Sequence, residues 1–236
     1  MYTTFSIETG VSIPSITYTC KRHVTGVMVQ AMPAQERFAP DAPFRFVGGD
    51  PSLDFVNTAD WTRRGLESDR FTSYDRLIEW ARGAGLVRQS HVRRLRRAAA
   101  RHPRQAAAAL AAARDVRDVL MAVFAAAVAR RHSALALDRL NTLFTDAAAH
   151  MRVVRDPRGG LQRGWAGLGD APESILWPVV ARAVDLLASP DARNLRMCAG
   201  RDCGWLYVDR SRNRLRRWCE MSVCGTAEKN RRRVRR

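Results

Sequence analysis

Four cysteines near the end of the chain are the residues whose type and spacing point most clearly to a chemistry. They form two pairs of the same spacing, Cys198-x4-Cys203 and Cys219-x4-Cys224, separated by fifteen residues. Two close pairs brought together by the segment between them can place four thiolates at the corners of a tetrahedron, which is how proteins hold structural zinc. Four thiolates leave no open coordination position. We therefore expect one Zn²⁺ per chain with a structural rather than a catalytic role.

Other interpretations of the cysteines stay open. They could be buried or free thiols that bind nothing, and an iron–sulfur cluster is the weaker alternative for a sulfur-only site. A disulfide framework fits less well, because five cysteines is an odd number and four of them are clustered in a chain of 236 residues. Cys20 stands apart and is expected to be a free thiol. The segment around the cluster is too short to bury much apolar surface, so a metal would have to hold it folded.

Positive charge gathers around the same cysteines. The chain carries a net charge of +17, and residues 193–236 hold 14 of its 40 Lys and Arg but 4 of its 23 Asp and Glu. Such a balance favours a polyanionic partner, while a solvated charged tail is the simpler alternative. Arginine replaces lysine almost everywhere, which a GC-rich genome would also produce, so the distribution of charge is more informative than its total. The candidate nucleic-acid contacts are Arg210, Arg212, Arg214, Arg216, Arg217, Lys229, Arg231, Arg232, Arg233, Arg235 and Arg236.

The elements that must position these groups are mainly helical. Apolar residues recur at helical spacing through most of the region upstream of the cysteines. Thr72 and Ser133 are candidate N-caps, Gly83 a candidate helix end, Pro103 a helix stop and Pro178 a kink. The predicted elements are a strand at 44–47, helices at 71–87, 90–102, 105–131, from Ser133 onward, 175–189 and 222–236, and hairpins at 151–165 and 204–218.

The predicted fold class is α+β: a mainly helical N-terminal domain with a few short strands, plus a small C-terminal four-cysteine zinc finger made of a hairpin followed by a basic helix. We assign 1–43 to a mobile leader, 44–190 to the helical domain and 191–236 to the finger, with the break at Ser189-Pro190-Asp191. The longest apolar run, VLMAVFAAAVA, is shorter than the ~18 residues of a spanning helix. The N-terminus lacks the pattern of a secretory signal. We expect no membrane partner and a cytoplasmic location.

These motifs resemble a known family. The C-x4-C pairs, GWLYVDRSRNRLRRWC and the closing CG before a basic helix look like the CGNR zinc finger, and FVGGDPSLDFVNT with the helices after it looks like the ABATE domain that accompanies that finger. The resemblance implies a stress-induced bacterial transcription regulator whose finger binds DNA, with the four cysteines as zinc ligands. Thr226 and Ala227 stand where the family name motif has Asn and Arg, which affects sequence preference more than the metal site.

Two polar residues in the ABATE-like segment are candidate anchors for a ligand. Asp54 and Asn57 lie among the apolar residues Leu53, Phe55 and Val56. Hydrogen bonding inside the fold is the interpretation that we favour for them, because most buried polar side chains serve that role.

The leading functional hypothesis is a zinc-dependent DNA-binding regulator, associated with the bacterial nucleoid, whose N-terminal domain senses a signal or forms a homodimer. An RNA- or ribosome-associated zinc module is the alternative, in which Trp205, Tyr207 and Trp218 stack on unpaired bases. An enzyme is not expected, since the sequence has no H-E-x-x-H, G-x-S-x-G, P-loop or deaminase motif. A protein-interaction module is a further interpretation. Duplex DNA is thus the first predicted partner and RNA the second.

Overall fold

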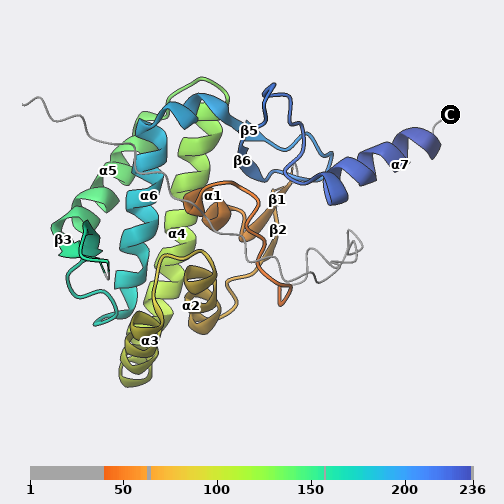
Figure 1. The fold of residues 1–236 in the computed structure, drawn as a ribbon. Helices are drawn as coiled ribbons and strands as arrows, with labels where there is room; N and C mark the ends of the chain where they lie inside the picture. Colours follow the sequence, from red (N-terminus) through yellow and green to blue (C-terminus); the bar gives the residue numbers. More distant parts are fainter. Residues whose placement is uncertain (1–39, 63–64, 157, 235–236) are drawn as a thin grey trace, which may run out of the picture. The chain divides into compact units, whose positions relative to one another are not determined.

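Helices dominate the part of the chain that the structure describes (Figure 1). The structure, a computed structural model, describes residues 40–62, 65–156 and 158–234. The chain divides into two units, Met1–Gln30 and Ala31–Arg236, and every described residue belongs to the second. Most of the predicted leader lies outside the described residues, as do Cys20, Arg235 and Arg236.

The elements follow one another as short helices and hairpins around a few long helices. The helices are α1 Pro51–Val56, α2 Tyr74–Gly83, α3 Gln89–Arg101, α4 Pro103–Val128, α5 Ala134–Ala149, α6 Trp177–Ala188 and α7 Thr226–Val234. The strands are β1 Ala59–Thr62, β2 Gly65–Asp69, β3 Met151–Arg155, β4 Leu161–Trp165, β5 Leu195–Met197 and β6 Leu206–Val208. Tight turns of 3₁₀ helix occupy Pro172–Leu176 and Pro190–Asn194. The predicted α+β class is confirmed.

Helix α4 carries a buried stripe along most of its length. Successive residues of this stripe are three or four positions apart, the spacing of one helix face, except for the last two, which are adjacent. They are Ala106, Ala109, Ala113, Val116, Leu120, Val123 and Phe124. The long helix predicted over 105–131 is therefore confirmed. It begins at Pro103, which we predicted as the stop of the preceding helix, because a proline at the first helical position has no N–H that would need a partner.

An aromatic cluster joins α1 and α2 in the core. Phe55, Phe71 and Trp80 are at most 1% exposed. The Phe55 and Trp80 ring centroids lie 5.0 Å apart in an edge-on arrangement, and Phe71 lies 5.4 Å from Phe55 and 6.0 Å from Trp80. Edge-on aromatic packing of this kind adds about 0.5–1.5 kcal/mol per pair to the burial of the rings. This packing holds α1 in place, and α1 in turn contacts β6 beside the cysteines.

One ion pair ties the β1–β2 hairpin to α4, and a second connects the two sides of the hairpin. Both terminal nitrogens of Arg117, which is 1% exposed, donate to the carboxylate of Asp69 at 2.7 Å. Arg70 pairs with the fully buried Asp60 at 3.0 Å. Burial alone would raise the pKa of Asp69, but hydrogen bonds and the positive charge of Arg117 outweigh it and lower that pKa. The hairpin is thus held against the helix by paired charges.

Each of the three described sheets is a two-stranded antiparallel hairpin. The hairpin predicted at 151–165 is confirmed as β3–β4, with Met151 opposite Trp165 and Arg155 opposite Leu161. The β1–β2 hairpin was not predicted. Its register shifts between Asp60 and Trp61, and this irregularity interrupts the alternation that identifies a strand in a sequence. No helix among the described residues has both the length and the apolar character needed to cross a bilayer.

Several local predictions need correction, and others hold. The strand predicted at 44–47 is wrong: these residues are irregular, and their apolar pattern arises because Phe44 packs on the main core while Val47 packs on the cysteine cluster. The cap of α2 is Ser73, whose Oγ accepts from the N–H of Arg76, and not Thr72. Ser133 caps α5 and α2 ends at Gly83, as predicted.

Pro178 makes no kink. It lies at the second position of α6, where a proline fits the start of a helix. The kink was predicted because the apolar pattern continues upstream of Pro178. The structure assigns that upstream part to the 3₁₀ turn at Pro172–Leu176.

Candidate metal centre

The first cysteine pair lies at the end of the β5–β6 hairpin. Leu195 pairs with Val208 and Met197 with Leu206, so Cys198 follows β5 directly. The N–H of Cys198 donates to Trp205 O at 2.9 Å, which extends the ladder by one residue. The hairpin predicted at 204–218 is therefore wrongly placed: β6 pairs with the residues before Cys198, and 209–218 contains no strand.

The second pair is shaped by a wide helical turn, Met221–Gly225, that leads into α7. The N–H of Cys224 donates to Glu220 O at 3.0 Å. A Cβ on Gly225 would lie 2.3 Å from Met221 Sδ, so a side chain here would require the exposed Met221 side chain to move aside. Gly225 thus lies in close contact with Met221, directly after the last cysteine.

The four sulfurs meet in one place. The Sγ atoms of Cys198, Cys203, Cys219 and Cys224 all lie within 4.8 Å of one another. The Cys203–Cys219 distance is 3.7 Å and the Cys219–Cys224 distance 3.6 Å. A zinc–sulfur bond of about 2.3 Å places tetrahedral sulfurs about 3.8 Å apart. None of the four cysteines forms a disulfide.

Four thiolates in this cluster would need a cation to compensate their charge. Hydrogen bonds from Cys203 and Cys219 lower the pKa of the Cys198 thiol to about 7. The contact with Cys198, together with burial, raises the pKa of Cys203 and of Cys219. Packed sulfurs with less than 10% exposure cannot all be anionic unless a positive ion compensates them.

Backbone donors complete the environment of one sulfur. The N–H groups of Gly200 and Cys219 point at Cys198 Sγ from 3.4 and 3.3 Å. Such second-sphere donors orient thiolate ligands and disperse their charge. The four cysteines therefore fit one structural zinc ion, with sulfur in all four positions and no site left for a substrate.

Two buried aromatic residues pack against the sulfurs. Trp205 and Tyr207 are 2% and 1% exposed and pack in one cluster with the cysteines. Tyr207 donates its hydroxyl to Arg216 O at 2.5 Å, and the Arg216 guanidinium lies over the Tyr207 ring at 4.3 Å. Trp218 packs at the edge of this cluster and is partly buried.

Asp209 organises the loop between the two cysteine pairs. Its carboxylate accepts from the N–H and Oγ of Ser211 at 3.0 and 2.6 Å and from the N–H of Arg216 at 3.0 Å. Burial opposes the charge, but these hydrogen bonds outweigh it and the pKa of Asp209 is lowered. The loop that carries several of the arginines is thus organised by the ionised Asp209 carboxylate.

Strand β6 is a wall shared by two clusters. Successive side chains of a strand point to opposite faces. Leu206 and Val208 join the main core, while Trp205 and Tyr207 join the cysteine cluster. The cysteine cluster therefore packs against one face of β6, and the core of the helical domain packs against the other.

Asn57 joins α1 to this strand with both ends of its side chain. Its Nδ2 donates to Leu206 O at 2.9 Å, and its Oδ1 accepts from the N–H of Leu206 at 2.9 Å. The carboxamide thus satisfies both backbone groups of a fully buried residue. The Asn57 side chain thus takes the place of a neighbouring strand as the hydrogen-bonding partner of β6.

Further hydrogen bonds extend this attachment on both sides of Leu206, and no sequence pattern indicates them. Gly204 N–H donates to Trp61 O at 2.6 Å, Trp205 Nε1 to Asp60 Oδ1 at 3.1 Å, and Val208 N–H to Gly48 O at 2.8 Å. Arg45 also pairs with Glu220. Backbone partners are invisible to a motif search, which depends on side-chain types.

Asp54 has a different role from Asn57. Its Oδ1 accepts from the N–H of Gly48 at 2.8 Å, and burial raises its pKa to about 7. Asp54 and Asn57 are 6% and 3% exposed, and both side chains hydrogen-bond to backbone groups of the chain. A ligand role for the pair stays a prediction.

Comparison with protein families adds to this geometry. Residues 49–190 match the family model ABATE, described as "Putative stress-induced transcription regulator". The chain belongs to the ABATE family. Residues 194–236 match the CGNR zinc finger, which spans the four cysteines and α7. The ABATE domain and the finger meet between Pro190 and Asn194, at the turn before β5. A search of curated proteins finds no match.

The arginines predicted to contact nucleic acid divide into two groups. One group is engaged within the chain: Arg210 with Asp191, Arg214 with Asn194, Arg216 with the carbonyls of Val47 and Trp218, and Arg231 with Asp202 and Glu228. The other group is exposed and makes no ion pair with a described residue: Arg212, Arg217, Lys229, Arg232 and Arg233. Thr226 and Ala227 lie in the first turn of α7, beside the metal centre.

We expect Asn57→Ala to destabilise the protein by about 2–3 kcal/mol, because both backbone groups of Leu206 would be left buried without a partner. Urea unfolding of the zinc-loaded protein measures this. Asn141→Ala, at an exposed position of α5, is the control and should change the free energy of unfolding by less than about 0.5 kcal/mol. Equal effects of the two substitutions would show that the attachment through Asn57 contributes nothing.

Asp54 should make stability depend on pH in an unusual direction. Its pKa of about 7 in the folded chain exceeds its ordinary value of 3.8, so the folded state binds the proton more tightly than the unfolded state. The free energy of unfolding that Asp54 contributes therefore falls as the pH rises from 3.8 to about 7. Asp54→Asn cannot ionise. Lowering the pH from 8 to 5.5 should therefore stabilise the wild type relative to Asp54→Asn by an amount on the order of 1–2 kcal/mol. The prediction is refuted if the melting temperatures of the wild type and of Asp54→Asn change with pH by the same amount.

Proposed function

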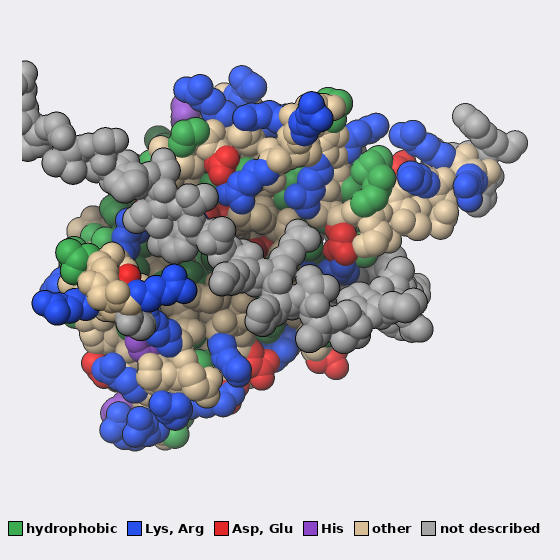
Figure 2. Space-filling view, viewed as in Figure 1, with side chains coloured by type: hydrophobic (Ala, Val, Ile, Leu, Met, Phe, Trp, Pro, Cys, Tyr) green, Lys and Arg blue, Asp and Glu red, His purple; other side chains and the backbone are tan. Residues whose placement is uncertain are grey.

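We propose that this protein is a transcription regulator that binds duplex DNA through its zinc-held finger. One observation carries the proposal: Lys229, Arg232 and Arg233 lie exposed on α7, at positions that share one helix face, directly after the last zinc ligand. Figure 2 shows basic side chains along α7 and over the neighbouring finger. Cations fixed on a rigid helix suit the phosphates of a duplex.

The loop side chains support the same surface. Arg212 and Arg217 are exposed in the segment between the cysteine pairs. The Arg217 guanidinium lies over the Trp218 ring at 5.4 Å, which limits its conformations. Arg231 pairs with Asp202 at 3.1 Å, beside Cys203, so this contact holds α7 against the first cysteine pair. The arginines that are paired within the chain thus hold the finger together, and the exposed arginines supply the charge available to DNA.

Burial of the aromatic residues favours duplex DNA over unpaired RNA. Trp205 and Tyr207 face the sulfurs and offer no ring to a base, so base stacking would have to rely on Trp218. An RNA-binding zinc module remains the second candidate because backbone charge serves either polymer. The proposal assigns no catalytic step to the chain and places it in the bacterial cytoplasm, on the nucleoid.

The salt dependence of binding tests the proposal. A contact with about six phosphates predicts a slope near −5 for the logarithm of the association constant against the logarithm of salt concentration. Fluorescence anisotropy with a mixed-sequence duplex, from 50 to 300 mM NaCl, measures it. A flat response would contradict phosphate binding, and tighter binding to a structured RNA of equal length would favour the RNA candidate.

Variants locate the contact. Replacing Lys229, Arg232 and Arg233 together by Gln should reduce the slope by about 2–3 units. The matched control replaces Arg93, Arg97 and Arg101 on α3 by Gln, which removes the same charge from another exposed helix. The control should leave the slope nearly unchanged, because salt screens charges beyond about 10 Å. Equal effects would mean that net charge rather than α7 drives binding.

Loss of the zinc ion should weaken DNA binding more than loss of the basic side chains of α7. Cys203→Ser removes one zinc ligand, and we expect binding to the duplex to be lost while the helical signal in circular dichroism remains. Metal analysis of the wild type should give one zinc per chain. Unchanged DNA affinity in Cys203→Ser would exclude a finger-based mechanism.

A further inference from the structure

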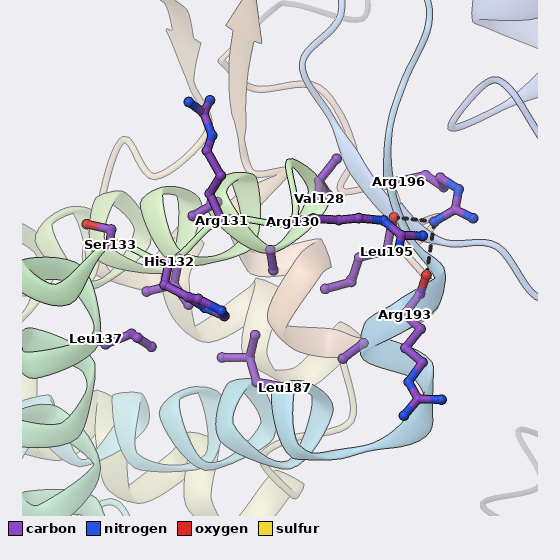
Figure 3. Close-up of a pocket in the computed structure, with 14 residues that line it drawn as sticks. Val128, Arg130, Arg131, His132, Ser133, Leu137, Leu187, Arg193, Leu195 and Arg196 are labelled. Carbon is purple, nitrogen blue, oxygen red and sulfur yellow. Dashed lines mark hydrogen bonds between the residues drawn. The ribbon is translucent and has the colours of Figure 1, made fainter.

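A pocket of about 530 Å³ opens where the ABATE domain meets the first strand of the finger (Figure 3). Its wall comes from the end of α4, the start of α5, the end of α6, the turn Pro190–Asn194 and β5. The volume lies within the range of small-molecule sites, about 300–1,000 Å³. It is separate from the metal centre: none of the four cysteines lines it.

The pocket combines an apolar interior with a basic rim. Val123, Leu137, Leu187 and Leu195 supply branched apolar side chains, together with several alanines. Four arginines and one histidine also line it, and none of its lining residues is acidic. The basic residues are Arg130, Arg131, His132, Arg193 and Arg196. A ligand that matches this lining has an apolar body and a negative charge at one end.

The basic groups do not all face the same way. In Figure 3 the Arg130 side chain extends from the end of α4 toward Leu195 and Arg196, and His132 reaches toward Leu187, whereas Arg131 points away. Arg130 has a φ of 53°, a left-handed conformation that is uncommon for a residue with a side chain. Arg196 donates to the carbonyls of Arg193 and Leu195 at 3.1 and 2.8 Å. Arg196 is thus partly engaged with the backbone, and Arg130 is the arginine of the lining that we expect to receive an anionic group.

We propose that this pocket binds a small organic carboxylate with an alkyl or aromatic body. A guanidinium offers paired N–H donors in the geometry of a carboxylate. The apolar interior, which would gain nothing from a free phosphate or sulfate, buries the body of the ligand. The inference concerns ligand binding and stands apart from DNA binding, so the two can be tested separately.

Occupancy would act on the finger through β5. Leu195 and Arg196 belong to this strand, and Cys198 follows it directly. The pocket exists while β5 lies against α4 and α6, so a ligand that needs all three walls stabilises that arrangement. Hydrogen exchange of the backbone amides in 195–208 should therefore slow when the ligand is bound.

Sodium octanoate is the probe, measured by isothermal titration calorimetry on the zinc-loaded full chain. We expect one site per chain. Octanoate should bind at least about tenfold more tightly than butyrate, which lacks most of the apolar body, and than 1-octanol, which lacks the charge. Equal affinity for octanol or for octyltrimethylammonium would overturn the proposal, as would no saturable binding below about 10 mM.

Two substitutions and a control tie the binding to the pocket. Arg130→Gln should weaken octanoate at least about tenfold, and Leu187→Glu, which places a like charge in the interior, should abolish its binding. Arg101→Gln on α3 removes a charge elsewhere and should leave the affinity unchanged. Thermal melts confirm that each variant is folded. Unaltered affinity in both pocket variants would overturn the proposal, whatever the outcome of the DNA measurements.

Discussion

The coordination of one cation by four sulfurs is the constraint on which the rest of this structure depends. Cys198 and Cys203 come from a hairpin end, and Cys219 and Cys224 from a loop and a helical turn. Hydrogen bonds such as that from Cys219 N–H to Cys198 Sγ join these segments, but their buried thiols cannot share one space as anions without a positive ion. Zinc therefore fixes the start of α7, and with it the direction in which the exposed cations point.

The same metal centre is inseparable from the ABATE domain. Strand β6 turns one face to the sulfurs and the other to the main core, and the Asn57 carboxamide satisfies both backbone groups of Leu206 at its centre. A finger of this size would be expected to depend on its metal alone. Here it also gains from a core shared with the helical domain. The pocket beside β5 borders that core, since Val123 and Leu195 belong to both.

Sequence predicted what depends on side-chain type and spacing, and missed what depends on backbone partners. The cysteine spacing predicted the ligand set, and the 3.6-residue period predicted α4. The run Trp205 to Val208 is apolar on both faces of a strand, which indicates burial on two sides, yet the sequence does not say that β6 pairs backward with 195–197. Asn57 stood out as polar among apolar residues, but its partners are a carbonyl and an N–H 149 positions away, which no local pattern can specify. The pocket was missed because its residues come from five separate elements.

The most direct test of the central claim is X-ray absorption at the zinc K-edge of the purified, full-length protein. The account predicts a first shell of four sulfur atoms at about 2.3 Å, with no nitrogen or oxygen ligand. A mixed shell with histidine or water would mean that one of the four cysteines is not a ligand. Absence of zinc, with the helices and β5–β6 still folded, would contradict the view that a sulfur-bound cation orders this end of the chain.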